Sequence, residues 1–323
     1  MTFLYIQRYI DIASLQMKKA FFQLHISVFL AGFTGILGRL ITLNEGMMVW
    51  YRLLITALSM WVLYAVFSKR LQKISWQDIL KISAVGFTAA MHWVTFYGAI
   101  KYANISVGLV CFSAVGFFTA LAEPLILRKK INRTELLLGL ITIGGIYIIF
   151  HFDTEYKTGI ILGIISAFLG CLFPIFNRRF LQRINVETVL TWQITGGFIT
   201  LSVLLPFYLQ QFPVSRFLPG WEDLLWLLVL SWICSVLAFR LTANALKHLS
   251  AFTVNLTYNL EPVYGILLAF MVYNENQYLS RWFYLGFAVI IGVLAFHVFL
   301  VIRSEKRAKA LQEELHPDEK ITL

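Results

Sequence analysis

One stretch of the chain combines a carboxylate with several neutral polar side chains in otherwise apolar sequence. Glu261 is followed directly by Pro262, and four hydrogen-bonding residues precede it within two helical turns: Asn255, Thr257, Tyr258 and Asn259. Proline removes a backbone donor and frees the carbonyl group four residues earlier. We therefore predict a polar wall of a substrate pathway here, with Glu261 as a cation partner or a proton-coupling group. The alternative is a glutamate held in a structural hydrogen-bond network.

A second polar stripe contains a histidine. Thr88, His92 and Thr95 recur at spacings of four and three residues, which places them on one face of a helix. Trp93 and Tyr97 flank this stripe. We predict that the stripe lines a substrate-binding cavity, whereas the alternative is a histidine that only bonds to a neighbouring helix.

Three further apolar stretches carry polar or aromatic candidates for binding a small molecule. Their side chains can pack as well as bind, so simple packing stays open as the alternative. Pro174 could break its helix near the site. The candidates are Ser113, Phe117, Asn177, Trp232 and Ser235.

Arginines also fall within apolar stretches, where a charge costs several kcal/mol and needs an explanation. They are Arg39, Arg52 and Arg240. Each could extend its charge to the membrane surface, pair with a carboxylate inside the membrane, or bind an anionic group of a substrate.

Common enzyme motifs are absent from the sequence, including G-x-S-x-G, H-E-x-x-H, the Walker A loop and G-x-G-x-x-G. Cys111, Cys171 and Cys234 share no metal-ligand spacing, and we interpret them as small apolar residues. We expect no metal or cofactor, and we expect a gradient rather than ATP hydrolysis to drive any transport.

The elements that must position these residues are membrane-spanning helices. The chain has 323 residues, of which 59% are hydrophobic and 14% charged, and its mean hydropathy is +0.74. Its apolar runs are about 20 residues long, enough to cross a bilayer as helix. They lack the period-two alternation of a β-barrel. The predicted spans are residues 20–42, 46–67, 77–99, 103–127, 134–152, 158–177, 187–210, 221–244, 249–273 and 281–303.

The net charge of +10 invites a nucleic-acid interpretation, but the placement of the charges argues against it. With the N-terminus inside, 20 of the Lys and Arg residues fall on cytoplasmic segments and only 4 on external ones. This asymmetry is the positive-inside pattern of a membrane protein. It predicts that both termini are cytoplasmic, which requires an even number of helices.

The sequence contains a duplicated unit. Lys101 and Lys247 end the same pattern, Ala-x-Lys, 146 residues apart. Other marks recur at offsets of 142 to 147, namely Glu45, Trp50, Gly139 and Gly145 with Glu187, Trp192, Gly286 and Gly292. Five helices per unit is an odd number, so the second copy must be upside down. We predict an all-α integral membrane protein with ten transmembrane helices as two inverted five-helix repeats.

The stretch from Ala245 through Leu260-Glu261-Pro262 to Asn274-Glu275 resembles the second half of an EamA-type transporter of the drug/metabolite transporter superfamily. Residues 99–145 resemble the matching part of the first half. The resemblance implies a central cavity and export or exchange of small metabolites, amino acids or drugs. Where the second half has Glu275, the aligned position of the first half is Lys129, so we transfer no named substrate.

We therefore predict a secondary transporter of a small organic solute in the inner membrane of a bacterium, working by alternating access and with membrane lipid around it. The expected segments are an N-terminal extension over residues 1–19, repeats over residues 20–152 and 158–303, and a cytoplasmic tail over residues 304–323. The alternatives are an intramembrane lipid-modifying enzyme and a sensor or scaffold without transport. The paired glycines could pack within one chain or against a second copy, which leaves a homodimer open.

Overall fold

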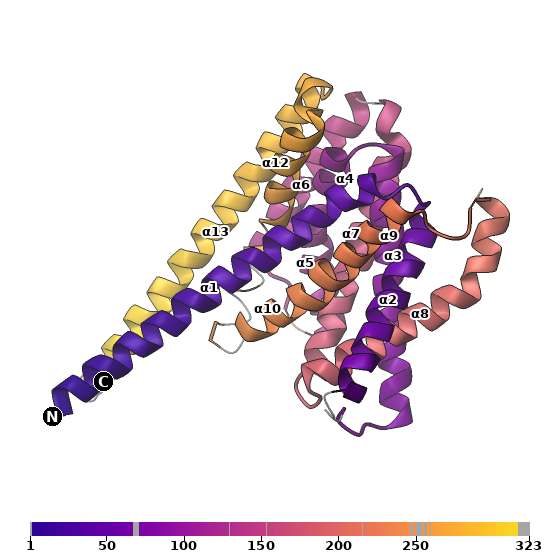
Figure 1. Cartoon of the computed structure of the whole chain (residues 1–323). Coiled ribbons are helices and arrows are strands. Elements are labelled where there is room, and N and C mark those ends of the chain that lie inside the picture. The colour runs from indigo at the N-terminus through magenta and orange to yellow at the C-terminus, as the bar shows by residue number, and fades with distance from the viewer. Residues whose placement is uncertain are drawn as a thin grey trace.

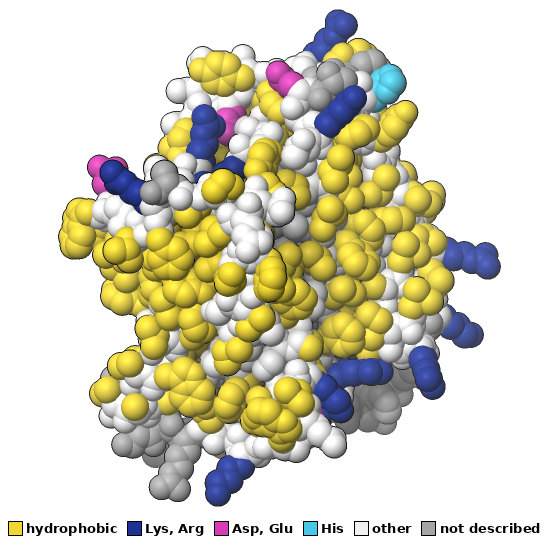
Figure 2. Space-filling model, turned by 90° about the vertical axis from the view of Figure 1, so that its right-hand side faces the viewer, with side chains coloured by type: hydrophobic (Ala, Val, Ile, Leu, Met, Phe, Trp, Pro, Cys, Tyr) yellow, Lys and Arg dark blue, Asp and Glu magenta, His cyan; other side chains and the backbone are white. Residues whose placement is uncertain are grey.

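The computed structural model describes residues 2–66, 71–128, 130–152, 154–214, 216–245, 248–249, 254, 257–258 and 260–315. These residues form helices and turns, with no strand among them. Figure 1 shows a bundle in which α1 begins and α13 ends at the same end. Figure 2 shows hydrophobic side chains over most of one face, with Lys and Arg toward its margins. The predicted all-helical membrane fold is confirmed.

In the described part of the chain, nine helical segments are long and apolar enough to cross a membrane, and a shorter apolar helix spans Glu261–Tyr273. The first repeat contains α1 (Thr2–Leu40), α2 (Glu45–Val66), α3 (Trp76–Tyr102), α4 (Ile105–Phe112), α5 (Val115–Leu127) and α6 (Arg133–Phe152). The second contains α7 (Lys157–Phe180), α8 (Val186–Gln211), α9 (Trp221–Leu228), η2 (Val229–Leu237), α10 (Ala238–Ala245), α12 (Glu261–Tyr273) and α13 (Arg281–Leu315). Two short 3₁₀ turns, η1 (Thr154–Tyr156) and η3 (Glu275–Gln277), complete the order.

Two of the predicted spans are interrupted rather than continuous. The span predicted over residues 103–127 consists of α4 and α5, with a turn at Ser113 and Ala114. In the span predicted over residues 249–273, α12 begins only at Glu261, because Pro262 has no N–H group and suits the first turn of a helix. Glu261 is therefore the first residue of α12 and lies at the midpoint of the predicted span, and Val254, Thr257 and Tyr258 before it are also helical.

The packing of the helices shows that the two repeats are related by symmetry. Helix α3 packs against α7 and α8. Its counterpart in the second repeat, α9–η2–α10, packs in the same way against α1 and α2. Helices α4 and α5 cover α7, as α12 covers α1, while α6 pairs with its own counterpart α13. Exchanging the two repeats thus reproduces the main contacts between them, as two copies related by a pseudo-two-fold axis require.

The backbone repeats the same symmetry. Ala114 N–H donates to Cys111 O at 3.1 Å, and 146 residues later Leu260 N–H donates to Thr257 O at 3.0 Å. These bonds span three residues rather than four, so both interrupted helices tighten at equivalent points. Farther along, α5 and α12 both end at a left-handed residue, Arg128 and Asn274, again 146 apart.

One residue distinguishes the two equivalent helices α3 and α9–η2–α10. They start with the same pattern, W-x-D-x-L, at Trp76 and Trp221, which are 145 residues apart. Past this start the offset is 146, as Lys101 and Lys247 show. The extra residue falls where η2 adopts π-helical geometry, which is how an inserted residue is accommodated in a helix.

Close backbone contact joins the last helices of the two repeats. A Cβ atom at Gly145 of α6 would lie 2.9 Å from Gly286 O of α13, and one at Gly286 would lie 2.5 Å from Gly145 O. The neighbouring Gly144 has nothing within 4 Å of such an atom. Only the glycine pair therefore allows α6 and α13 to cross this closely, as small residues commonly do in membranes.

We expect Gly145→Ala to lower the stability of the purified protein by about 1–3 kcal/mol, because the added methyl group would overlap the α13 backbone. Gly144→Ala is the matched control on the same helix and should be neutral or slightly stabilising. The measurement is thermal unfolding in detergent. Equal unfolding temperatures for the two variants would contradict the crossing.

Candidate functional site

A buried arginine lies between the two repeats. Arg52 of α2 is only 5% exposed. Its Nη1 donates to Tyr97 OH at 2.8 Å and its Nε to Ser235 Oγ at 3.1 Å. The guanidinium carbon lies 4.1 Å from the ring centroid of Trp93. An arginine in apolar surroundings needs such partners, because desolvating an unpaired charge is costly.

The π-helical segment η2 brings two serines to this arginine. Ser235 Oγ accepts from Arg52 and donates to Leu230 O, five residues earlier, at 3.0 Å. Ser231 Oγ donates to the backbone oxygen of Arg52 at 3.3 Å. Both serines are buried. Segments with π-helical geometry occur frequently at functional sites, and here the segment joins the second repeat to α2.

Glu261 lies near Arg52 without forming a direct ion pair in the described part of the chain. The two side chains interact electrostatically. The Glu261 side chain is half-buried, and within the described residues its carboxylate has no hydrogen bond. Helix α1 approaches closely on this side, since a Cβ atom at Gly32 would lie 2.9 Å from Glu261 O. Arg52 and Glu261 are thus two ionisable groups that interact electrostatically, with no direct bond between them among the described residues.

His92 is tied to the second repeat by Ser166 of α7. Its Nδ1 lies 2.9 Å from Ser166 Oγ and 3.0 Å from Ser166 O. Ser166 Oγ also lies within donating distance of His92 O, at 3.2 Å. Rings of Phe96, Phe112 and Phe173 surround the imidazole at centroid distances of 5.1 to 6.1 Å. The histidine therefore has a structural partner and an aromatic setting.

The equivalent place in the second half is a cluster of hydroxyl groups. Ser27 Oγ donates to Ala238 O at 2.9 Å and lies 2.7 Å from Thr242 Oγ1 and 2.9 Å from Tyr258 OH. The Thr242 and Tyr258 hydroxyls are 2.7 Å apart. Ala238 lies 146 residues after His92, which makes the two positions equivalent. Ser166 bonds to the backbone oxygen of His92, and Ser27 bonds to the backbone oxygen of Ala238.

The two halves therefore share a framework but differ in chemistry. Phe96 and Phe112 of the first half correspond to Thr242 and Tyr258 of the second, each pair 146 residues apart. The cluster of the first half is aromatic with an imidazole, and the cluster of the second half carries hydroxyl groups.

Six of the predicted site residues lie in these clusters: His92, Trp93, Tyr97, Ser235, Tyr258 and Glu261. Asn255 and Asn259 lie outside the described residues. The remaining four predicted residues lie outside these clusters. Ser113 Oγ donates to Leu109 O of its own helical turn at 3.3 Å. Phe117 faces α6, where a Cβ atom at Gly139 would meet it.

The last two predicted residues have surroundings of their own. Trp232 is half exposed, and its Nε1 donates to Ser59 Oγ at 2.8 Å. Asn177 lies near the end of α7, and its Oδ1 is buried with no hydrogen-bond partner in the described residues. Neither contacts Arg52 or Glu261 through any bond that the structure describes.

Sequence reasoning missed the central role of Arg52 and the two serines Ser27 and Ser166. Arg52 resembles any arginine near a helix end until its burial is known. The serines carry a detectable signal, because Ile26-Ser27-Val28-Phe29-Leu30 recurs as Ile165-Ser166-Ala167-Phe168-Leu169, 139 residues later. Within the described residues, no group of three or more His, Cys, Asp or Glu side chains could hold a metal ion.

Comparisons with known proteins agree on one class of protein. The model of the EamA-like transporter family matches residues 18–151 and again 157–298. An uncharacterized transporter of Haemophilus influenzae is 24% identical over 272 residues, which cover 78% of this chain and 85% of the relative. The uncharacterized transporter YdfC of Bacillus subtilis is 22% identical over 302 residues, 89% of this chain and 96% of the relative.

A solved crystal structure of a protein has the same fold. It superposes with a TM-score of 0.59 at 14% sequence identity, covering 87% of this chain and 98% of the other. At this level of identity the likeness concerns the arrangement of the helices only.

We expect Tyr97→Phe to destabilise the protein by about 1–3 kcal/mol, because it leaves one N–H of a buried guanidinium without its partner. Tyr278→Phe, at a residue that is 73% exposed, is the matched control. The measurement is thermal unfolding of both variants in detergent. An equal loss of stability in both variants would mean that the Arg52–Tyr97 bond contributes nothing to the stability of the protein.

Proposed function

Because the chain belongs to the EamA-like transporter family and is a multi-pass membrane transporter, we propose that it is a secondary transporter of a small organic solute. It moves the solute by alternating access between its two inverted repeats. Export or exchange is the direction that we propose. A bacterial inner membrane with both termini in the cytoplasm is the proposed setting, supported by the distribution of Lys and Arg over the segments between the helices.

The observation that carries this proposal is the pair of charges between the repeats. Arg52 uses two of its five N–H groups in bonds to Tyr97 and Ser235 among the described residues. The Glu261 carboxylate interacts with Arg52 only through space in that part of the chain. An anion alone or a cation alone would compensate one charge and leave the other. A solute with one acidic and one basic group, such as an amino acid, compensates both.

The proposed energy source is an ion gradient, because the sequence contains no nucleotide-binding motif. Glu261 is the proposed coupling group. A carboxyl group in apolar surroundings can be neutral in one conformation and charged in another, which would link its protonation to the alternation of the transporter.

The first experiment identifies the solute class. Purified protein is screened by thermal shift against amino acids, carboxylic acids and amines of similar size. A bound ligand at 100 times its Kd stabilises the native state by about 2.7 kcal/mol. Members of the panel that bind are then tested for flux in proteoliposomes. A complete panel without flux would reject the transport proposal, and stabilisation by amines or acids alone would reject the doubly charged solute.

We expect Arg52→Lys to reduce flux in proteoliposomes at least about tenfold, since an ammonium group cannot bond Tyr97 and Ser235 while stacking on Trp93. Arg240→Lys is the control, because Arg240 is exposed and the change is chemically identical. Equal flux in the two variants would remove Arg52 from the transport site.

We expect Glu261→Gln to abolish the dependence of flux on an imposed pH gradient, because an amide side chain does not gain or lose a proton at the pH values of the assay. Glu155→Gln, at an exposed acidic residue outside the membrane spans, should keep the wild-type dependence. Flux is measured over a series of inside and outside pH values. An unchanged pH dependence in Glu261→Gln would exclude Glu261 as the coupling group.

A further inference from the structure

Glu275 is a buried carboxylate that joins the two repeats at one end of the bundle. It is 3% exposed and lies in η3, directly after α12. Its Oε1 accepts from Arg39 Nη1 at 2.9 Å and from Ile105 N at 3.1 Å. Its Oε2 accepts from Ser106 N at 2.9 Å and Ser106 Oγ at 2.6 Å. One side chain thus binds α1 and α4 of the first repeat to the second repeat.

These four bonds are strong and are not easily replaced. Hydrogen bonds to an ionised carboxylate are roughly twice as strong as those between neutral groups. The Ile105 and Ser106 amides belong to the first turn of α4, where backbone N–H groups have no partner within the helix. Separating Glu275 from them would expose a buried charge and two orphan donors at once.

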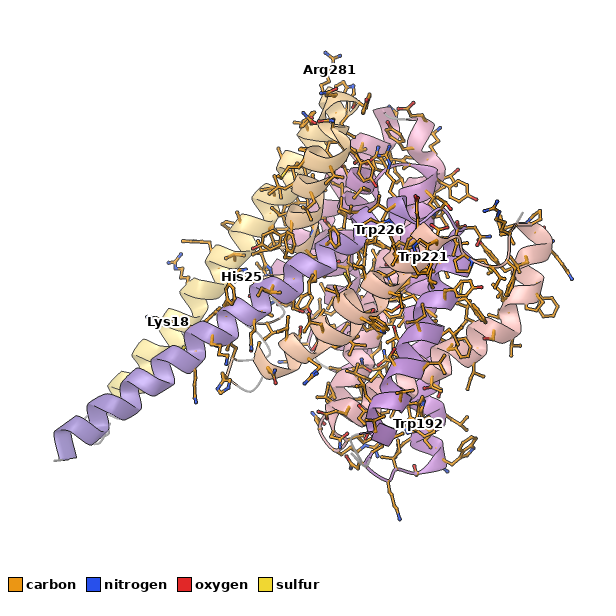
Figure 3. All side chains as sticks on the ribbon, viewed as in Figure 1. Lys18, His25, Trp192, Trp221, Trp226 and Arg281 are labelled. Carbon is orange, nitrogen blue, oxygen red and sulfur yellow. The ribbon has the colours of Figure 1, made fainter. Side chains whose placement is uncertain are left out.

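A cavity open to the surface lies at the opposite end of the bundle. Its volume is about 280 Å³, and it lies between the start of the membrane part of α1 and the end of α10, lined by Gln16, Lys19, Ala20, Gln23, Asn244 and His248. Figure 3 shows Lys18 at this end and Arg281, just after Glu275, at the other. Helices α6 and α13 touch at Gly145 and Gly286, toward the Glu275 end.

The sequence provides this carboxylate in one repeat only. The position equivalent to Glu275 in the first repeat, 146 residues earlier, is Lys129. The first repeat therefore cannot form the equivalent contact at the other end of the bundle, because it has a lysine where the second repeat has Glu275. The contact that Glu275 makes therefore has no counterpart of the same chemistry in the first repeat.

We propose that Glu275 is a latch that holds the bundle closed at its own end, so that the transporter rests open toward the end that contains the cavity. This inference rests on the alternating access of the proposed function. The four bonds of Glu275 must break when the protein opens at the latched end, and they re-form when it returns.

Hydrogen–deuterium exchange of the full-length protein in lipid nanodiscs tests the latch without any solute. Glu275→Gln keeps one acceptor oxygen but turns N–H donors toward the amides of α4. We expect exchange in peptides covering residues 37–44 and 103–108 to rise at least about tenfold, because hydrogen bonds to a charged carboxylate are stronger than those to a neutral amide. Exchange in residues 16–23, at the open end, should fall as that end closes.

Two milder variants and one control are measured together with Glu275→Gln. Ser106→Ala removes one of the four bonds, and Arg39→Gln removes an ion pair whose arginine is 45% exposed, so both should shift exchange less in the same direction. They replace Glu275→Gln if that variant does not fold. Glu155→Gln, exposed and with the same loss of charge, should change nothing.

Faster exchange at both ends would show that Glu275 only stabilises the fold, and unchanged exchange at both ends would show that its bonds hold nothing closed. Either result overturns the latch. Because no solute is present, a protein that moves nothing in the flux assay but shows opposite shifts at its two ends would reject the transport proposal and keep the latch.

Discussion

The cost of placing a guanidinium in the interior of a membrane bundle governs the centre of this protein. Arg52 needs partners that water would otherwise supply, and it finds them on α3 and η2, which belong to different repeats. Tyr97 and Ser235 can both reach it only if α3 and η2 converge on α2. The charge thus fixes the relative position of three helices at the point where the two halves meet, and it sets the electrostatic surroundings of Glu261.

Around that centre, close backbone contact replaces the hydrophobic effect as the source of specificity, since lipid is as apolar as the protein interior. Gly145 with Gly286, and Gly32 beside Glu261, bring helix backbones within van der Waals distance. Hydroxyl groups then hold the helices in register, with Ser27 and Ser166 bonding to equivalent carbonyl groups of the facing helices. Packing determines how near the helices come, and these bonds determine which residues face each other.

Much of this architecture could be predicted from the sequence, because apolar length, charge asymmetry and repeat offsets are all one-dimensional properties. The all-helical membrane fold and the duplication followed from them. The interruptions of two helices did not, although Pro262 marks one of them. Arg52 was not singled out, because burial depends on which side chains of other helices arrive beside it. For the same reason the sequence could not separate Trp232, which points outward, from Ser235, three residues later, which faces Arg52.

The π-helical segment η2 has a consequence for how the two halves came to differ. One additional residue in a regular α-helix would rotate everything on one side of it by about 100° relative to the other side, but the π-helical turn absorbs that residue and leaves both flanks equivalent to α3. The extra residue therefore changes the helix only locally, where Ser231 and Ser235 contact Arg52. One residue of additional length is thus confined to the part of the helix that faces Arg52, while the rest of the helix keeps the symmetry of the two repeats.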